Sequence, residues 1–289
     1  MNRQSEAPIG VYDTGVGGLS VLGALTALLP AESFYYVADG ANCPYGDREP
    51  DEIVRLALGV SEHLAGAGCK AIVVACNTIS ATALPALRAQ LAIPIVGMVP
   101  AVKPAVALTR TGVIGVLATT ATVRGALYLD VLERFAQNAR VISQPCPGLV
   151  DLIEAGKLES QEAVDLLQRC LAPIVEAGAD VVVLGCSHYP FARHQIARLL
   201  GPGVEIIEPS GAIARQTQRV LEREGLLSHE GHRASVSYAT SGDTDAFDEA
   251  VYRLVARRPK AQGLRWEHGR LEAIAVPAGT ERSAAVRNV

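Results

Sequence analysis

Short apolar runs rich in β-branched residues, each ending abruptly at a small or polar residue, constrain the fold of this chain most strongly. They span residues 9–12, 34–38, 71–75, 113–117 and 181–184, and they end at Asp13, Asp39, Cys76, Ala118 and Gly185. Such unbroken runs are typical of strands buried on both faces of a sheet. Between them, residues 51–67 and 160–177 carry apolar side chains at helical spacing. The alternation predicts an α/β fold with mostly parallel sheets.

The chain also carries a weak internal repeat. Residues 70–78 (KAIVVACNT) match residues 180–188 (DVVVLGCSH), and residues 9–19 and 112–123 form a looser pair. Two similar α/β domains would each place one cysteine at the carboxyl end of a strand, where open parallel sheets bind their ligands. We expect residues 1–98 plus 209–289 to form the first domain and residues 99–208 to form the second, with the active site between them. Residues 277–289 are expected to be a loose tail.

Composition excludes several classes of function. The chain has 289 residues, of which 49% are apolar, so it can bury a core without disulfides or metals. A net charge of -4 offers no electrostatic footprint for a nucleic-acid partner. No basic leader followed by an apolar run and no long apolar span is visible, so we expect neither secretion nor a membrane partner. Six scattered cysteines do not resemble a disulfide framework, and a reducing cytoplasm is the simplest location.

Two of these cysteines, Cys76 and Cys186, stand in matching strand-end contexts. A single cysteine is usually a small buried hydrophobe, but a matched pair in a repeat is not well explained in that way. A helix following each cysteine would favour thiolate over thiol. One thiolate can remove a proton from one face of a carbon while the other cysteine, as a thiol, returns a proton to the opposite face. Asp13 and His188 are the natural helpers of this pair, although each alone is as well explained as a cap or a hydrogen-bonding partner.

Other motifs indicate a small anionic ligand. Residues 13–18 (DTGVGG) follow a strand and precede a helical segment, so their backbone N–H groups can hold an anion. The glycine pattern is not that of a dinucleotide site, and a carboxylate fits better. Thr119 and Thr122 can bond a substrate carboxylate or simply cap a helix. Residues 44–46 (PYG) indicate a turn that carries an aromatic residue.

In combination, these motifs resemble those of the glutamate racemases in the aspartate/glutamate racemase superfamily. The matches run in order along almost the whole chain: YDTGVGGLSVL at 12–22, PYGDR at 44–48, ACNTISA at 75–81, GVLATTATV at 115–123, LVDLIEAG at 149–156, GCSHYPF at 185–191 and YATSGD at 238–243. The resemblance implies two α/β domains with the site between them, commonly as a homodimer. It also implies cofactor-independent and metal-independent interconversion of L- and D-glutamate, which supplies D-glutamate for peptidoglycan.

The resemblance also assigns roles to residues. It implies that Cys76 deprotonates D-glutamate with help from Asp13, and that Cys186 deprotonates L-glutamate with help from His188. Glu154 aligns with a further helper acid. The substrate contacts implied in the same way are Asp13, Thr14, Tyr45, Gly46, Asn77, Thr78, Thr119, Thr122, Ser187 and His188.

Four positions depart from the family pattern. Thr14 stands where the family usually has serine, and Ser187 stands where it usually has threonine. Both positions therefore keep a hydroxyl group. Ala118 replaces a usual glycine, and Asp151 replaces a usual proline. Three alternatives stay open at this stage: a related enzyme of this fold acting on aspartate or another substrate, a metal or redox site formed by Cys76, Cys186 and His188, and a non-catalytic binding protein. The spacing of these two cysteines and His188 along the sequence is not typical of a zinc site. Domain closure around the substrate is expected, because a dry site strengthens the donors around it.

Overall fold

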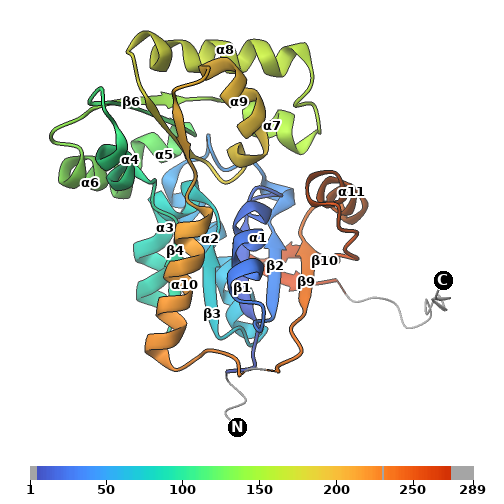
Figure 1. Ribbon diagram of the computed structural model, residues 1–289. Coiled ribbons are helices and arrows are strands. Elements are labelled where there is room, and N and C mark those ends of the chain that lie inside the picture. Colours follow the sequence, from blue (N-terminus) through green and yellow to red (C-terminus); the bar gives the residue numbers. More distant parts are fainter. Residues whose placement is uncertain (1–4, 230, 275–289) are drawn as a thin grey trace.

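The computed structural model describes residues 5–229 and 231–274. Figure 1 shows two α/β units, with the smaller sheet and its helices above the larger sheet. Within the described residues, every strand pair is parallel except β10 with β11. The predicted α/β fold with mostly parallel sheets is therefore confirmed.

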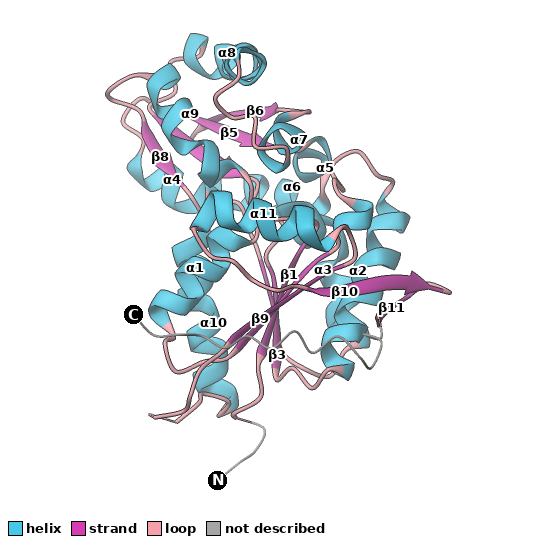
Figure 2. Ribbon diagram, turned by 90° about the vertical axis from the view of Figure 1, so that its right-hand side faces the viewer, coloured by secondary structure: helices cyan, strands magenta, loops and turns pink. Residues whose placement is uncertain are grey.

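The larger sheet of the described chain has seven strands, and it draws them from both ends of the sequence. In spatial order they are β11 (Arg270–Ala273), β10 (Gln262–Glu267), β9 (Val236–Thr240), β2 (Phe34–Ala38), β1 (Ile9–Asp13), β3 (Ala71–Val74) and β4 (Ile95–Gly97). Figure 2 shows β10 and β11 extending this sheet at one edge. The C-terminal strands thus lie beside the first strands of the chain.

The smaller sheet has four strands, all from the middle of the sequence. Their spatial order is β6 (Arg140–Pro145), β5 (Val113–Ala118), β7 (Val181–Gly185) and β8 (Glu205–Ile207). The strand pairs β1–β3 and β5–β7 occupy equivalent places in the two sheets, and the two cysteine motifs follow β3 and β7. The sequence repeat therefore corresponds to a repeated structural unit.

Helices cover both faces of each sheet (Figure 1). Those that pack with the larger sheet are α1 (Leu19–Leu28), α2 (Pro50–Gly66), α3 (Asn77–Gln90), α10 (Ser210–Glu224) and α11 (Thr244–Val255). Those of the smaller sheet are α4 (Val102–Leu108), α5 (Thr120–Arg124), α6 (Ala126–Phe135), α7 (Leu149–Glu154), α8 (Gln161–Glu176) and α9 (Arg193–Leu200). Two short 3-10 helices, Gly40–Asn42 and Tyr189–Ala192, complete the described elements. Local signals place these helices: α2, for example, begins at a proline and carries two acids in its first turn.

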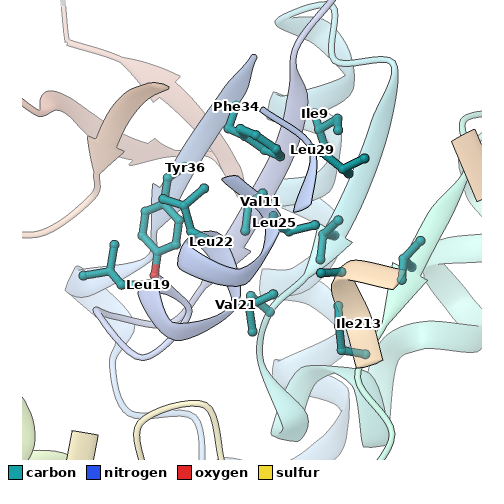
Figure 3. Close-up of a cluster of buried hydrophobic side chains, with 14 of the residues drawn as sticks. Ile9, Val11, Leu19, Val21, Leu22, Leu25, Leu29, Phe34, Tyr36 and Ile213 are labelled. Atoms are coloured by element: carbon teal, nitrogen blue, oxygen red, sulfur yellow. The ribbon is translucent and has the colours of Figure 1, made fainter. Parts of the chain in front are cut away.

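The core follows the alternation of side chains along each strand. On β1, Ile9 and Val11 face α1 and α10, whereas Tyr12 faces α2 on the other side of the sheet. Figure 3 shows the first of these clusters, with Leu25 and Phe34 packed against β1. Each fully buried aliphatic side chain contributes about 1.5–3 kcal/mol to folding. The result is a rigid sheet whose carboxyl edge can hold polar groups in fixed positions.

The division of the strands suggests the domain organisation. We propose that residues 1–98 plus 209–289 form one domain and residues 99–208 the other, because the two sheets exchange no strand. The expected tail at 277–289 lies outside the described residues. Among the described helices, none has both the length and the apolar character needed to span a membrane.

Candidate active site

Asp13 and the turn after it lie at the carboxyl edge of the larger sheet. Asp13 ends β1 and is fully buried. Its Oδ1 accepts a 2.6 Å hydrogen bond from the backbone N–H of Thr14, and its Oδ2 accepts a 2.7 Å bond from Ser187 Oγ. Burial raises the pKa of Asp13, although the positive charge of His188 and these hydrogen bonds oppose the shift. The bond from Ser187 joins the two units, because Ser187 follows β7 of the smaller sheet.

Cys76 and Cys186 both stand at carboxyl ends of strands, as the repeat predicts. Cys76 precedes α3 and is 5% exposed, and Cys186 follows β7 and is 4% exposed. Burial, and then the negative charge of Asp13, raise the pKa of Cys76 well above its ordinary value, with a further contribution from the charge of Cys186. The two thiols therefore share one buried site.

The helix start after Cys76 favours the thiolate as expected, but it does not determine the net shift of the pKa. The backbone N–H of Ile79 in the first turn of α3 does lower the pKa of this thiol, but burial outweighs it. The expectation of a helix directly after Cys186 needs correction, because the segment that follows is the short 3-10 helix Tyr189–Ala192. The Sγ atom of Cys186 lies 4.0 Å from His188 Nδ1. A partner imidazole, rather than a helix, accompanies this thiol.

His188 and Glu154 form a charged pair beside Cys186. His188 Nε2 lies 2.7 Å from Glu154 Oε1, and the same oxygen accepts a 2.8 Å bond from the backbone N–H of Val16. Burial alone would lower the pKa of His188, but its contacts with Cys186 and Glu154 outweigh burial and raise that pKa well above its usual range. Burial likewise opposes the ionised form of Glu154, yet the bond and charge of His188 hold its pKa below the usual value. The imidazolium is thus fixed between an acid and a thiol.

Three threonine hydroxyls form a second group in the site. Thr78 Oγ1 on α3 lies 2.8 Å from Thr119 Oγ1, which lies 2.9 Å from Thr122 Oγ1. Thr119 Oγ1 also accepts a bond from the backbone N–H of Thr122 and thereby caps α5. Thr119 therefore caps α5, and its hydroxyl still lies with those of Thr78 and Thr122 at the junction of the two units. The capping role is thus compatible with the predicted contact to a substrate carboxylate.

In the part of the chain that the structure describes, the side-chain amide of Asn77 is buried without a protein partner. It is 1% exposed, and within the described structure neither Nδ2 nor Oδ1 of its side chain has a hydrogen-bond partner. An unpaired buried amide costs about 1–3 kcal/mol, so natural proteins keep one mainly where function requires it. A side chain with one donor and one acceptor group suits a ligand that carries both carboxylate and ammonium.

The remaining predicted contacts lie around this site in different ways. Thr14 is buried, and its Oγ1 lies 3.6 Å from the thiol of Cys43. The Gly46 carbonyl accepts a 3.1 Å bond from the Ala121 backbone N–H, which ties the turn at 44–46 to α5. The hydroxyl of Tyr45 donates its proton to Asp39, so toward a ligand it can act only as an acceptor.

Sequence reasoning missed two neighbours of the site. Cys43 lies 3.9 Å from Glu154 Oε1, and burial raises the pKa of its thiol well above the ordinary value. Asp39 is 1% exposed and accepts several hydrogen bonds. A signal for Asp39 was present, because it ends its strand as Asp13 does. Cys43 directly precedes the motif at 44–46, but nothing in the neighbouring sequence indicates that its thiol is activated.

One group of described residues has the composition of a metal site. Ligand atoms of Cys43, Glu154 and His188 lie within 4.8 Å of one another. A metal there would have to replace the hydrogen bond between His188 and Glu154. This set shares only His188 with the metal alternative considered from the sequence.

The site is closed to solvent. Asp13, Cys76, Asn77, Cys186 and His188 are each 5% exposed or less. A cavity of about 360 Å³ between α7 and α11 reaches Cys43 and Glu154, but neither Cys76 nor Cys186 lines it. The two thiols are thus shielded from solvent in this structure.

Comparison with known proteins identifies the family. Residues 17–217 match the Asp/Glu/Hydantoin racemase family. The chain is 49% identical over 242 residues to the glutamate racemase of Herpetosiphon aurantiacus, covering 84% of this chain and 95% of that one. It is 48% identical over 257 residues to that of Ectopseudomonas mendocina, covering 89% and 97%.

Solved structures give the same result. The glutamate racemase isoform RacE1 of Bacillus anthracis superposes with a TM-score of 0.83 at 30% identity, covering 92% of this chain and 99% of that one. The Escherichia coli glutamate racemase, solved with L-glutamate and the activator UDP-MurNAc-ala, superposes with a TM-score of 0.78 at 30% identity, covering 93% and 100%. The fold, the paired strand-end cysteines and these matches together show that the chain belongs to the Asp/Glu/hydantoin racemase family and, within it, to the glutamate racemases, which are isomerases.

Proposed function

We propose that this protein interconverts L- and D-glutamate by direct proton transfer at Cα, with Cys76 and Cys186 as the two bases and without a cofactor. The observation that carries the proposal is the pair of buried thiols at equivalent strand ends, each beside one helper. Asp13 contacts Cys76 and raises its pKa, and His188 contacts Cys186. Each half of the site thus pairs a cysteine with a charged helper, which is the negative Asp13 for Cys76 and the positive His188 for Cys186.

In the proposed reaction, one thiolate and one thiol exchange roles. With L-glutamate, the Cys186 thiolate removes the Cα proton, and the Cys76 thiol gives its proton to the opposite face. The product is D-glutamate, and the enzyme is left with a Cys186 thiol and a Cys76 thiolate. Imidazolium at His188 stabilises the Cys186 thiolate, and Glu154 holds that imidazolium in place. The reverse reaction starts from the second state.

Thiolate basicity alone cannot carry this reaction. A thiol has a pKa of about 8.5, whereas the Cα proton of an amino acid is far less acidic. The developing carbanion must therefore be stabilised by fixed donors around the α-carboxylate. We propose that Asn77, Thr78, Thr119 and Thr122, with the backbone N–H groups of the 14–18 turn, supply these donors. Asp13, Thr14, Tyr45, Gly46, Ser187 and His188 would complete the contacts around the substrate.

The biological setting follows from the reaction. We propose that the enzyme supplies D-glutamate for peptidoglycan, acts in the cytoplasm and forms a homodimer. Free thiols support the location, because all six cysteines are unpaired and a reducing compartment keeps them so.

A series of conservative cysteine variants tests the proposal. Cys76→Ser and Cys186→Ser replace each thiol by a much weaker acid of nearly the same size, and each should lower kcat/KM for glutamate about 10²–10⁴-fold. Cys43→Ser is the matched control: this half-buried thiol lies beside Glu154 but has no helper of its own, and activity should stay within about threefold. Racemisation is followed by circular dichroism from both enantiomers. Full activity in either of the first two variants would rule out the two-base reaction. Activity with aspartate but not with glutamate would instead assign the alternative substrate.

A further inference from the structure

The C-terminal strand β10 contributes a side chain to the support of the active site. Trp266 on β10 donates a 2.7 Å hydrogen bond from Nε1 to Asp39 Oδ1. Asp39 follows β2, so the two residues lie far apart in the sequence but meet at the carboxyl edge of the larger sheet. Neither residue belongs to the machinery described above, and both lie beside it.

Asp39 gathers donors from three separate segments. Besides Trp266, its carboxylate accepts a bond from Ser241 Oγ after β9, from Asn42 Nδ2 at 3.0 Å and from the Tyr45 hydroxyl. It is 1% exposed, so water does not compete for these bonds. A buried carboxylate is expensive unless its lone pairs are all used, and the geometry around Asp39 depends on every donor.

Two of these donors belong to the segment of residues 42–46, which we call the substrate loop. Tyr45 is 1% exposed, and burial together with the Asp39 carboxylate raises the pKa of its hydroxyl, which therefore remains a donor. Gly46 follows directly and accepts the backbone N–H of Ala121, next to the threonine cluster. The position of the substrate loop is thus set at one end by Asp39 and at the other by α5.

Trp266 is itself held in place by packing. A Cβ built on Gly59 of α2 would lie 2.5 Å from the indole ring, so the ring fills the space that this glycine leaves open. The edge of the indole ring thus packs against α2, while its N–H points to Asp39. Because the indole has a single N–H donor, it can hold the Asp39 carboxylate in one orientation.

We propose that Trp266 is a positioning residue for the substrate loop, acting through Asp39 on Tyr45. The inference rests on the proposed function, since it assigns Trp266 an effect on glutamate binding. Loss of the indole N–H leaves Asp39 Oδ1 with Ser241 and Asn42 as its donors, and the carboxylate turns toward them. Tyr45 moves with it, and the loop no longer closes on the substrate in the same place.

Trp266→Phe tests the inference, because phenylalanine keeps an aromatic ring against Gly59 and removes only the N–H donor and part of the ring. The expected result is a 3- to 10-fold rise in KM for both enantiomers, with kcat changed less than twofold. Arg265→Ala is the control: it lies on the same strand with an exposed side chain, and its KM should equal that of the wild type. A purely structural role would lower the melting temperature of Trp266→Phe and leave KM unchanged, and that result would overturn the inference.

A second readout needs no variant at Trp266. The chain contains a single tryptophan, so emission excited at a wavelength that tyrosine does not absorb reports on this residue alone. Titration of the wild type with glutamate should change the emission with a midpoint that matches the kinetic constant, and Tyr45→Phe should shift the emission of the free protein. Emission that responds to neither would overturn the inference. Absence of glutamate racemisation by the wild type would instead refute the proposed function, and the shift in Tyr45→Phe would still test the link between Tyr45, Asp39 and Trp266.

Discussion

The carboxylate of Asp13 is buried completely, and we propose that this position serves chemistry at the expense of stability. Burial raises its pKa, so the ionised form is the one that folding disfavours. The same charge raises the pKa of Cys76, which makes the Cys76 thiolate a stronger base once it has formed. The residue is held by Ser187 and by the Thr14 backbone rather than by a permanent ion pair. A functional charge kept at this position should therefore lower the stability of the fold.

Asp13→Asn is predicted to stabilise the protein and to inactivate it. Because the folded pKa is raised, the cost of the charge is absent below the unfolded pKa of about 3.9 and grows as the pH rises through the folded pKa. The variant should gain about 0.5–2 kcal/mol at neutral pH, and this gain should vanish in acid. Activity should fall about 10²–10⁴-fold. Thermal unfolding across the pH range measures the first effect, with the exposed Glu133→Gln as control. A variant less stable than the wild type at neutral pH would contradict the account.

Individual site residues differ in how far the sequence predicts them. Cys76, Cys186 and Asp13 each follow a recognisable buried strand, and a repeat pairs the cysteines, so physical reasoning alone finds them. Glu154 ends a short helix with no comparable signal, and only the resemblance indicates it. Its contact with His188 depends on packing between segments 34 residues apart. Pairings of this kind are set by tertiary structure, which no local pattern encodes.

At the level of elements, the turn between β1 and α1 is built to let the second unit approach. Gly15 and Gly17 both face that unit: a Cβ at Gly15 would lie 1.9 Å from Glu154 Oε1, and one at Gly17 would lie 2.3 Å from His188 Nδ1. Neither glycine has a positive φ, so the backbone itself would accept alanine. These glycines therefore provide space for the helper pair.

Gly17→Ala is predicted to displace the His188 imidazole without unfolding the chain. A shift of about 1 Å in a catalytic group can cost about 10²-fold in rate, so kcat should fall by at least that factor. Gly23→Ala in α1 is the matched control, because a Cβ there meets nothing within 4 Å and alanine favours the helix. Steady-state kinetics with both enantiomers and far-ultraviolet circular dichroism check both variants. Full activity in Gly17→Ala would contradict the packing described here.

The predicted elements agree with the structure where burial is continuous. Strands expected at 34–38 and 71–75 appear as Phe34–Ala38 and Ala71–Val74, and the helix expected at 51–67 is Pro50–Gly66. The weaker strands were not predicted. β6 is only half-buried and β11 is mostly exposed and carries two charges, so their pairing depends on a sheet that has already formed. Long-range pairing of this kind also brings Trp266 to Asp39.

On the scale of the described molecule, the two units pack against each other, and the candidate site residues are buried at their junction. Polar contacts cross that junction at several points: from Ser187 to Asp13, from Ser20 to the Ser187 carbonyl, from Val16 to Glu154 and from Ala121 to Gly46. A site of this kind strengthens each donor by excluding water. We predict that it opens for each exchange of substrate and product, because the two thiols are buried.

Opening can be measured through the thiols themselves. A bulky thiol reagent should label Cys76 and Cys186 only while the units are apart, and glutamate should stabilise the closed form. At a glutamate concentration 100 times its Kd, the labelling rate should fall about 100-fold. Mass spectrometry identifies the modified residues, and Cys69 in the core of the larger unit provides an internal reference. Equal labelling rates with and without glutamate would show that entry does not require the units to separate.

The most direct test of the two-thiol reaction is the fate of the Cα hydrogen in deuterated water. Purified protein is incubated with L-glutamate, without added cofactor or metal, and both enantiomers are analysed by NMR during the first turnovers. The account predicts that newly formed D-glutamate carries deuterium at Cα while the remaining L-glutamate still carries protium, because the proton is removed by one thiol and returned by the other. Early deuterium in the remaining L-glutamate, or D-glutamate that retains the original proton, would contradict it.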